Sequence, residues 1–387
     1  SKLYDPLYPL PYNYSTATGD KIHPQYLEEM VRSLRPPLHM PILQVLPDVQ
    51  PYTWETSASL LVTVNTSQAL NLPSVQFTCW LLAPNNTKLQ VVASSSSLKT
   101  GWQEEVTLQL QSIPVSMNAS ALLCTVQNPQ GGAQLASVTV PVIRVTRKEN
   151  EVKINNRNMG LIGADGLPLF GFGFYYDWDD KTAPIVLEEV RNGFNTPLPY
   201  RPGSPSPPGY LDLMKAAAQS SVRLHYDMYQ LGQQPPSANK TQTIINTVTQ
   251  MMDQTGLLAY YIADEPDGSG FGLDPSWLRE VYLQIKSIDP WHPVTLVLNC
   301  ANSARRYDQC ADVIMVDPYC IDVAQPVGCD DCTGHVYDVS NRVESVVLQI
   351  NGSRPLWTIL QSFTGTEHWP RLPSWQEIRS MTYLATI

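Results

Sequence analysis

Two different patterns of apolar and polar positions divide this chain of 387 residues. Between residues 42 and 150, short runs of β-branched and apolar residues alternate with turn residues, which is typical of a β-sandwich domain. The expected strands are Ser59–Val64, Ser74–Leu82, Leu89–Ser94, Glu105–Gln111, Ala121–Gln127 and Ala136–Val145.

Residues 1–41 are instead rich in Pro and Tyr, and proline is not tolerated in the interior of a regular helix. We expect an extended N-terminal arm that drapes over its own domain. Because so many tyrosines are unlikely to be left in water, the alternative is an arm that docks on another molecule. Its partner would be a second copy of the chain or another extracellular protein, bound by strand addition.

After residue 150 the pattern changes. Residues 151–165 predict a hinge that ends in a turn at Asp165-Gly166, and strand-like and helix-like segments alternate from there onward. The expected strands are Leu169–Tyr176, Phe194–Leu198, Val222–Tyr226, Leu257–Ala263, Val294–Leu298, Val313–Val316 and Leu356–Leu360. The expected helices are Ile185–Val190, Leu211–Ala218, one with Ile244, Ile245, Val248, Met251 and Met252 on one face, one that begins at Asp274 and Pro275, Arg305–Cys310, Val339–Ile350 and Trp375–Ile387.

Seven successive βα units close most economically as an eightfold barrel. We therefore expect a multidomain β plus α/β protein, with a β-sandwich followed by a (β/α)₈ TIM barrel over residues 151–387. The barrel lacks its last strand in this sequence, so we expect the natural chain to continue. An open doubly wound sheet is the competing fold, but nothing here resembles its glycine-rich phosphate turn.

Charge and hydropathy exclude two classes of partner. The formal net charge is −10, so the chain lacks the basic face that sequence-independent nucleic-acid binding requires. No stretch approaches the ~18 consecutive apolar residues of a membrane span. The histidines are scattered without His-x-x-x-His spacing, so we expect neither a metal site nor a cofactor.

Asn-x-Ser/Thr triplets indicate a secreted glycoprotein. Six of them lack proline in the middle position. Their asparagines are Asn13, Asn65, Asn85, Asn118, Asn239 and Asn351. They coincide with seven cysteines and few lysines, which fits an oxidising, extracellular setting. The first residues do not have the charged start and apolar core of a signal peptide, so we expect that it has been removed.

The cysteines predict disulfide bonds. Cys79 and Cys124 each lie inside an expected strand, which favours a bridge between the two sheets of the sandwich, with a buried pair of free thiols as the alternative. The other five are Cys300, Cys310, Cys320, Cys329 and Cys332. Cys329-Asp-Asp-Cys332 has the spacing of a redox or zinc motif, but no second pair has metal-ligand spacing. We expect two local bridges and one leftover thiol that pairs with a further part of the chain or with another chain.

Polar residues at the C-terminal ends of the expected strands carry the functional weight, because a TIM barrel forms its active site there. In chain order they are Tyr176, Asp177, Asp179, Arg201, His225, Asp227, Asp264, Glu265, Asn299, Asp317, Tyr319, Gln361 and Phe363. Sugars need this combination of flat apolar faces for stacking and carboxylates for the acetal oxygen and the ring hydroxyls. We expect a substrate pocket lined by Asp264, His225, Tyr319, Gln361, Tyr176 and Asp177.

The segment Tyr260-Tyr261-Ile262-Ala263-Asp264-Glu265-Pro266 resembles the fourth-strand motif of the retaining glycoside hydrolase clan with (β/α)₈ barrels. In that clan Asn-Glu or a variant ends the strand. The segment from Asp165 to Tyr176 looks like the barrel entry of enzymes with an N-terminal β-sandwich, such as family 2 glycosidases. The resemblance spans about residues 155–387 and implies that Glu265 is the general acid/base. The alternative interpretation, which does not use this resemblance, is that Glu265 is a salt-bridged residue at a strand end.

The seventh expected strand departs from that pattern. The clan has its nucleophile, a Glu, at the end of this strand, whereas this chain has Gln361, and an amide cannot form the glycosyl–enzyme ester. Three substitutes are conceivable. Glu367 could enter from the following loop, Asp317 could be the base of an inverting mechanism, or a substrate acetamido group could attack, oriented by Gln361 or Asp264.

The sequence therefore predicts a secreted glycoside-hydrolase-like protein that hydrolyses glycosidic bonds of a glycan, with Glu265 and Asp317 as the catalytic candidates. The alternative is a catalytically inactive barrel that serves as a glycan-binding or structural module of an extracellular glycoprotein assembly.

Overall fold

The computed structural model describes residues 43–65, 72–177, 188, 192–200, 210–219, 222–268, 273–300, 302–323, 332–364 and 368–385. Several predictions fall outside these ranges. They are the N-terminal arm with Asn13, the helix Ile185–Val190 except for Glu188, and the residues Asp179, Arg201, Cys329 and Glu367.

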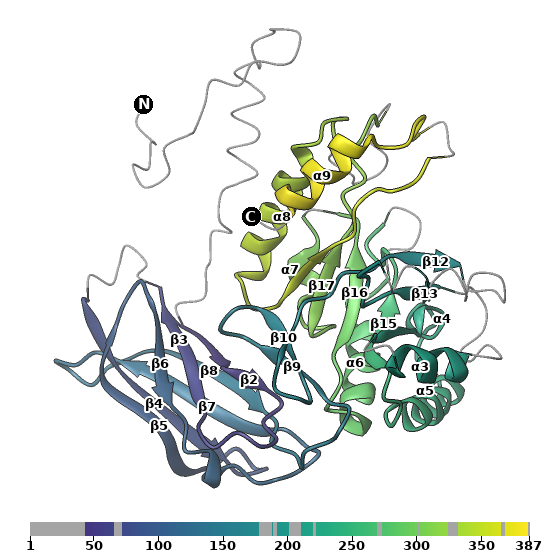
Figure 1. The fold of residues 1–387 in the computed structure, drawn as a ribbon. Helices are drawn as coiled ribbons and strands as arrows, with labels where there is room; N and C mark the ends of the chain where they lie inside the picture. The colour runs from purple at the N-terminus through teal and green to yellow at the C-terminus, as the bar shows by residue number, and fades with distance from the viewer. Residues whose placement is uncertain are drawn as a thin grey trace, which may run out of the picture. The chain divides into compact units, whose positions relative to one another are not determined.

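Two antiparallel sheets form the first part of the described chain (Figure 1). One has the order β1-β3-β6, with the strands Leu43–Pro47, Ser59–Val64 and Gln103–Thr107. The other has the order β5-β4-β7-β8, with the strands Lys88–Lys99, Ser74–Leu82, Ser120–Gln127 and Gln134–Val142. Every second residue of β4 is buried, and the inward side chains of both sheets form one apolar cluster that includes Leu60, Phe77 and Leu122. Two sheets that share a core in this way make a β-sandwich.

Most of these strands were predicted. β3 and β4 have the expected bounds, whereas β5 is longer, and the expected strand Glu105–Gln111 ends in the short 3₁₀ helix η1, Leu110–Ser112. The sequence missed β1 and the two-residue strand β2, Val49–Gln50, because prolines interrupt their apolar run.

The disulfide bond between Cys79 and Cys124 is present, but it does not join the two sheets. β4 and β7 are neighbours in one sheet, and the two cysteines are opposite each other in the register, with Cα atoms 4.0 Å apart. The prediction of an inter-sheet bridge was wrong because alternation shows which face a residue occupies but not which strands are adjacent.

The cysteines of the second half form bridges as expected but correct the prediction for the leftover thiol. Cys332 forms a disulfide bond with Cys320, so it is not available to a Cys-x-x-Cys redox or zinc motif. Cys300 is disulfide-bonded as well. Cys310 is a free thiol, but it is buried, so it is not exposed for pairing with another chain. Burial, with a smaller contribution from the carboxylate of Asp308, raises the pKa of this thiol to about 12.

The expected hinge is a piece of sheet. β9, Val152–Asn155, and β10, Gly160–Gly163, pair as an antiparallel hairpin. β2 and β11, Pro168–Leu169, extend it to four strands in the order β11-β10-β9-β2. The turn at Asp165-Gly166 is confirmed, with Gly166 at a φ of +80°. The segment after the sandwich is therefore an ordered connection.

Seven parallel strands follow, in chain order. They are β12 (Tyr175–Asp177), β13 (Leu198–Tyr200), β14 (Leu224–Asp227), β15 (Leu257–Ala263), β16 (Val294–Leu298), β17 (Val313–Val316) and β18 (Leu356–Thr358). The helices between and after them are α3 (Tyr210–Gln219), α4 (Tyr229–Gly232), α5 (Ala238–Met251), α6 (Pro275–Ile288), α7 (Ala304–Tyr307), α8 (Asp338–Ile350) and α9 (Trp375–Leu384). Hydrogen bonds join β12 to β13 and run unbroken from β14 to β18, and β13 lies beside β14. The fold is thus a multidomain β plus α/β fold.

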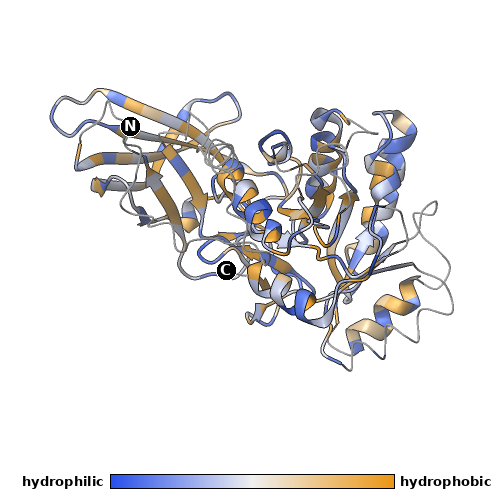
Figure 2. Cartoon of the chain, turned by 90° about the horizontal axis from the view of Figure 1, so that it is seen from above, coloured by the Kyte–Doolittle hydropathy of each residue, from blue (hydrophilic) through white to orange (hydrophobic). Residues whose placement is uncertain are grey.

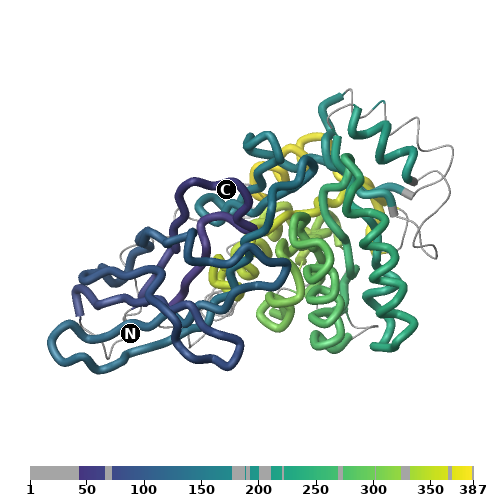
Figure 3. The backbone as a smooth tube through the Cα atoms, turned by 90° about the horizontal axis from the view of Figure 1, so that it is seen from below, coloured from purple at the N-terminus to yellow at the C-terminus, as the bar shows by residue number. Residues whose placement is uncertain are grey.

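The helices have the caps that their sequences predict. The side chain of Asp274 accepts a hydrogen bond from the backbone of Ser276, and Pro275 is the first residue of α6. α9 begins with a capping box between Ser374 and Glu377. Successive helices from α5 to α9 pack side by side (Figure 3). Both apolar and polar positions occur along them (Figure 2), and no helix of the described ranges is long and apolar enough to cross a membrane.

The parallel sheet has two apolar faces, one against the helices and one turned inward. The outer cluster includes Tyr260 and Ile262 of β15, and the inner cluster includes Tyr261 of the same strand. His225 of β14 and Trp357 of β18 meet on the inner face with ring centroids 5.5 Å apart. In a flat sheet these two strands would be ~19 Å apart, so the sheet curls strongly. No pairing between β12 and β18 closes it among the described strands.

The ends of the first two parallel strands differ from their predicted bounds. β12 begins at Tyr175, and β13 is shifted to Leu198–Tyr200. The side chain of Asn195 bonds the backbone nitrogen of Phe172 and the backbone oxygen of Phe170, and a Cβ atom at Gly173 would overlap the backbone of Thr196. Hydrogen bonds from the Asn195 side chain thus replace part of the backbone pairing between these two segments. A pattern of apolar positions does not predict such bonds.

Candidate functional site

Carboxyl groups gather at the C-terminal ends of β15 and β17. Asp264 and Glu265 follow β15, and Asp317 follows β17. Glu265 has a φ of +43°, a backbone conformation that side chains other than glycine rarely adopt. It is held by a hydrogen bond of 3.1 Å from its nitrogen to Val297 O and one of 2.9 Å from Gly268 N to its oxygen. Backbone strain of this kind clusters at functional sites.

Asp317 and Glu265 form a carboxyl pair. Asp317 is 5% exposed and is hydrogen-bonded to Glu265, while its Oδ1 atom is buried without a hydrogen-bond partner. Burial, followed by the charge of Glu265 and the hydrogen bond to it, raises the pKa of Asp317 well above its usual range. Two carboxylates in contact cannot both be ionised, so this pair holds a proton.

Asp264 is linked to the interior of the curled sheet. The hydroxyl of Tyr261 donates a hydrogen bond of 2.6 Å to its Oδ1 atom, and the ring of Tyr175 lies against Tyr261 with centroids 5.8 Å apart. Burial raises the pKa of Asp264; the hydrogen bond from Tyr261 opposes this, and the charge of Glu265 adds to it. Asp264 is therefore hydrogen-bonded to Tyr261 of the inner face and coupled by charge to Glu265 of the carboxyl pair.

Two further polar groups orient these carboxyls. Asn299, which follows β16, donates a hydrogen bond of 3.1 Å from Nδ2 to Oε2 of Glu265. Arg342 of α8 is 1% exposed, donates to the backbone oxygen of Asn299, and counteracts the rise in the pKa of Asp317. One buried cation thus faces this group of carboxyls.

Gln361 does not face Glu265. Its side chain is completely buried, and its amide makes two hydrogen bonds with the backbone of Ile321. Oε1 accepts from Ile321 N at 2.8 Å, and Nε2 donates to Ile321 O at 3.4 Å. The prediction that Gln361 lines a substrate pocket was wrong, because a residue that satisfies both polar groups of a peptide unit is fixed to that backbone.

Aromatic side chains cover the ends of β17 and β18. Tyr319 contacts Phe363 and Trp369 edge to face, with centroids 4.9 and 5.9 Å apart, and the indole of Trp369 donates a hydrogen bond of 3.0 Å to Tyr319 O. Burial and the nearby carboxyl of Asp317 raise the pKa of the Tyr319 hydroxyl well above its usual range. Tyr319, Phe363 and Trp369 thus form an aromatic cluster, and all three residues are partly exposed.

The remaining predicted site residues are arranged differently from the expectation. His225 is 3% exposed and lies within the inner face, where burial lowers its pKa to about 3, so it is a neutral core residue. Tyr176 packs against the outer cluster, whereas its neighbour Tyr175 packs against the inner one. The expected strand was read one residue out of phase. Asp177 pairs with Tyr200 through the backbone.

Sequence reasoning missed Tyr175, Tyr261 and Arg342. The two tyrosines could have been found from alternation along β12 and β15, counted from the strand ends. Arg342 lies between the buried residues Val339 and Val346 at helical spacing, so it is a cation on an apolar face. That pattern is the signal of a buried charge that needs a partner.

The described side chains also bear on metal binding and on glycan attachment. No group of three or more His, Cys, Asp or Glu side chains in the described part of the chain could hold a metal ion. Of the predicted glycosylation sites, Asn85, Asn118 and Asn239 are exposed. Asn351 is partly buried and exchanges hydrogen bonds with Gln44.

No protein-family model matches the chain, and no curated protein matches it. Among solved structures it is similar to a β-glucuronidase from an uncultured Clostridium sp. (TM-score 0.44, 13% identity, 90% of this chain and 59% of that chain). It is also similar to β-glucuronidases from Lactobacillus rhamnosus (0.43, 16%, 89% and 59%) and Ruminococcus gnavus (0.44, 12%, 89% and 60%). The chain spans about 60% of their length. TM-scores below 0.5 are too low to assign this chain a function.

Proposed function

We propose that this chain is a secreted glycoside-hydrolase-like protein that binds a glycan at the C-terminal ends of its parallel strands without cleaving it. We further propose that the parallel strands belong to a (β/α)₈ barrel. The chain-order succession of strands and the contact between His225 and Trp357 across the inner face support the barrel. The disulfide bonds Cys79–Cys124 and Cys320–Cys332 support an oxidising compartment.

The observation that carries this proposal is the contact between Asp317 and Glu265. A retaining glycosidase holds its two carboxyl groups ~5–5.5 Å apart, and an inverting one ~6.5–9.5 Å apart, because the sugar and the water must fit between them. Hydrogen-bonded carboxyls are closer than either. With Gln361 bonded to the backbone of Ile321, the site holds no group at the nucleophile position that could form a glycosyl ester.

Glycan binding is supported by the aromatic cluster of Tyr319, Phe363 and Trp369. Phe363 and Trp369 are partly exposed and pack on Tyr319, and the charges of Asp317 and Glu265 act on the hydroxyl of Tyr319. Aromatic rings beside hydrogen-bonding groups are what a sugar ring requires, with its apolar face and its hydroxyl rim.

Two assays of the full chain test this proposal. Aryl glucosides, galactosides and glucuronides should not be turned over by the wild type, by Glu265→Gln or by Gln361→Glu. On a glycan array the wild type should bind, Trp369→Ala should lose at least tenfold in affinity, and Trp102→Ala should not. Trp102 is the matched control because it is 73% exposed on the sandwich. Equal loss in both variants, or no binding at all, would contradict a glycan site at the strand ends.

Hydrolysis with Glu265 as general acid/base is the second candidate. Glu265 is only partly buried and its Oε2 atom is oriented by Asn299, as a proton donor requires. Asp317 would then be the second carboxyl, after the pair separates. Turnover of an aryl glycoside by the wild type that Glu265→Gln and Asp317→Asn both abolish would establish this candidate and refute binding without cleavage.

A further inference from the structure

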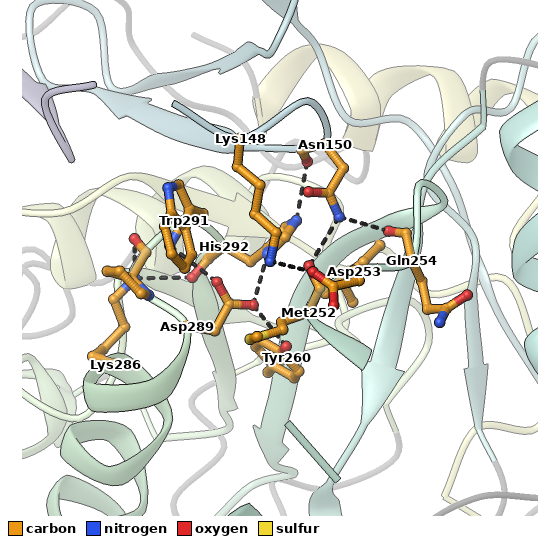
Figure 4. Close-up of polar contacts among 12 residues, drawn as sticks. Lys148, Asn150, Met252, Asp253, Gln254, Tyr260, Lys286, Asp289, Trp291 and His292 are labelled. Carbon is orange, nitrogen blue, oxygen red and sulfur yellow. Dashed lines mark hydrogen bonds and ion pairs between the residues drawn. The ribbon is translucent and has the colours of Figure 1, made fainter. Parts of the chain in front are cut away.

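A second polar cluster lies at the opposite, N-terminal ends of the parallel strands (Figure 4). There the segment 146–152, which connects the sandwich to the α/β part, rests on the loops before β15 and β16 within one compact unit. Trp291 donates from its indole to Thr146 O at 2.8 Å, and its own oxygen accepts from Val152 N at 3.1 Å. Asn150 donates from Nδ2 to the backbone oxygens of Met252 and Gln254.

Asp289 lies beneath this segment with both of its carboxylate oxygens hydrogen-bonded. Its side chain is 0% exposed. Oδ1 accepts from Trp291 N at 3.0 Å, and Oδ2 accepts from the Tyr260 hydroxyl at 2.7 Å. Nδ1 of His292 lies 2.7 Å from the same Oδ2 atom. No water or surface group is needed to satisfy this carboxylate.

The two ring nitrogens of His292 both face acceptors. Nδ1 faces Oδ2 of Asp289, and Nε2 lies 3.0 Å from the backbone oxygen of Asn150, which can only accept. Nε2 must therefore carry a proton, and a second proton must lie between Nδ1 and Oδ2. The pair Asp289–His292 therefore holds two protons in total. This count is the same whether the second proton is bonded to Nδ1 of the ring or to Oδ2 of the carboxyl. The same oxygen of Asn150 also accepts from Arg223 at 2.9 Å.

We propose that Asp289 and His292 form a pH-sensitive latch that holds the segment 146–152, and with it the end of the sandwich, on the α/β part. The bond from Nε2 to Asn150 O closes the latch. When the pair loses a proton, one ring nitrogen presents a lone pair to an acceptor, and the bond to Asp289 or to Asn150 becomes a repulsion between lone pairs.

Other charged groups around the latch cannot donate to Asp289 or Asn150 in place of the His292 ring if the pair loses its shared proton. Lys286 donates to the backbone oxygens of Pro290 and His292 and pairs with Asp312 at 3.1 Å. Lys148 pairs with Asp253 at 2.7 Å. The groups that face the pair from the packed elements are Tyr260 of β15, Lys286 of α6 and Arg223, which directly precedes β14. Both cations are fixed to backbone oxygens, so neither can take the place of the ring proton.

The direction of the pH effect follows from the two partners. Burial alone would raise the pKa of Asp289, but His292, Tyr260 and Lys286 outweigh it and lower that pKa below its usual range. The contribution of Asp289 is therefore fully present above about pH 4, the range of an unfolded Asp, and is lost as pH falls through the lower value. On the alkaline side the contribution of the pair is fully present below about pH 6.5, the range of an unfolded His, and is lost as pH rises to the point where the folded pair releases its shared proton. It is strongest in the window between these limits.

The experiment follows the unfolding of the full chain in urea between pH 5 and pH 9.5, for the wild type, His292→Gln and His225→Gln. Above about pH 6.5, where an unfolded His has released its proton, the unfolding constant of the wild type should rise by up to about tenfold per pH unit relative to His292→Gln, and it should level off at the pH where the latch opens. His225→Gln is the matched control, since His225 is also buried and burial lowers its pKa to about 3. A constant ratio between wild type and His292→Gln across this range would overturn the latch.

A measurement on the wild type keeps the proposal testable should His292→Gln fail to fold. In protein labelled with ¹⁵N in histidine, both ring nitrogens of His292 should carry protons at pH 7, and the indole N–H signal of Trp291 should change at the pH where one proton is lost. One bare ring nitrogen at pH 7, together with an unchanged Trp291 signal, would contradict the proposal.

Discussion

The two ends of the parallel sheet each bury an Asp beside another titratable group, and the two carboxyls differ in their partners, their hydrogen bonds and the direction of their pKa shifts. At the C-terminal ends, Asp317 faces Glu265, has an oxygen without a partner, and has its pKa raised. At the N-terminal ends, Asp289 faces His292, has both oxygens bonded, and has its pKa lowered. Burial opposes the charged form in both, so the partner decides the charge.

This difference separates a functional region from a structural one. Stability selects for buried polar groups that are fully bonded, and Asp289 meets that condition. Asp317 does not, because its Oδ1 atom is unpaired beside a strained Glu265. An arrangement that costs free energy and is nevertheless present is typical of a site that binds something.

The largest effect is expected from Asp289→Asn. The substitution removes one charge of a buried pair and leaves the hydroxyl of Tyr260 and the ring of His292 competing for one oxygen. We predict a loss of about 3–5 kcal/mol in the free energy of unfolding at pH 7. Urea unfolding followed by circular dichroism measures it, and a loss below about 1 kcal/mol would show that this end of the sheet does not depend on the ion pair.

A smaller loss is expected from Gln361→Ala, which removes both hydrogen bonds to the backbone of Ile321 and leaves buried donor and acceptor groups unpaired. We predict about 2 kcal/mol in the free energy of unfolding. Gln242→Ala is the control, because Gln242 is exposed on α5, and it should remain within about 0.5 kcal/mol of the wild type. Equal effects would indicate that Gln361 is not a structural clamp.

Asp317→Asn should act in the opposite direction to Asp289→Asn. Because the pKa of Asp317 is raised in the folded state, folding at pH 7 takes up a proton that the unfolded chain has released, and this costs free energy. An amide removes that cost, so we predict a gain of about 1 kcal/mol at pH 7. The gain should vanish below about pH 4, where the unfolded Asp is protonated as well. A loss of stability at pH 7 would mean that Asp317 is an ionised, paired carboxylate.

The smallest pH effect is expected from His225→Gln. Burial lowers the pKa of His225 to about 3, so the folded protein does not protonate this ring near neutrality. The unfolded chain does protonate it below about pH 6.5, so the wild type loses stability there as pH falls. Stability curves of the variant and the wild type should therefore be parallel from pH 7 to pH 9. A slope difference in that range would mean that His225 titrates inside the sheet.

The sequence predicted the elements better than their contacts. Alternation located β3 and β4 to the residue, and the caps at Asp274 and Ser374 fixed the starts of two helices. The pairing of Cys79 with Cys124 within one sheet was not predictable, because periodicity identifies a face but not a neighbour.

The candidate site was predicted in part for the same reason. Glu265 and Asp317 do meet at the strand ends, since parallel strands bring their carboxyl ends to one edge. The roles of Gln361 and Arg342 depend on which backbone each side chain reaches, and that is set by tertiary packing. The latch was missed altogether, because Asp289 and His292 read as an ordinary turn before a strand.

The most direct test is a titration of the aspartate side-chain carboxyls in ¹³C-labelled protein from pH 2.5 to pH 8, with Asp317→Asn and Asp289→Asn used for assignment. The account predicts that Asp317 remains protonated well above the usual range of about pH 4 and that Asp289 remains ionised below it. If Asp317 is ionised at pH 5, the carboxyl pair does not share a proton, and Glu265 and Asp317 are free to act as separate catalytic groups.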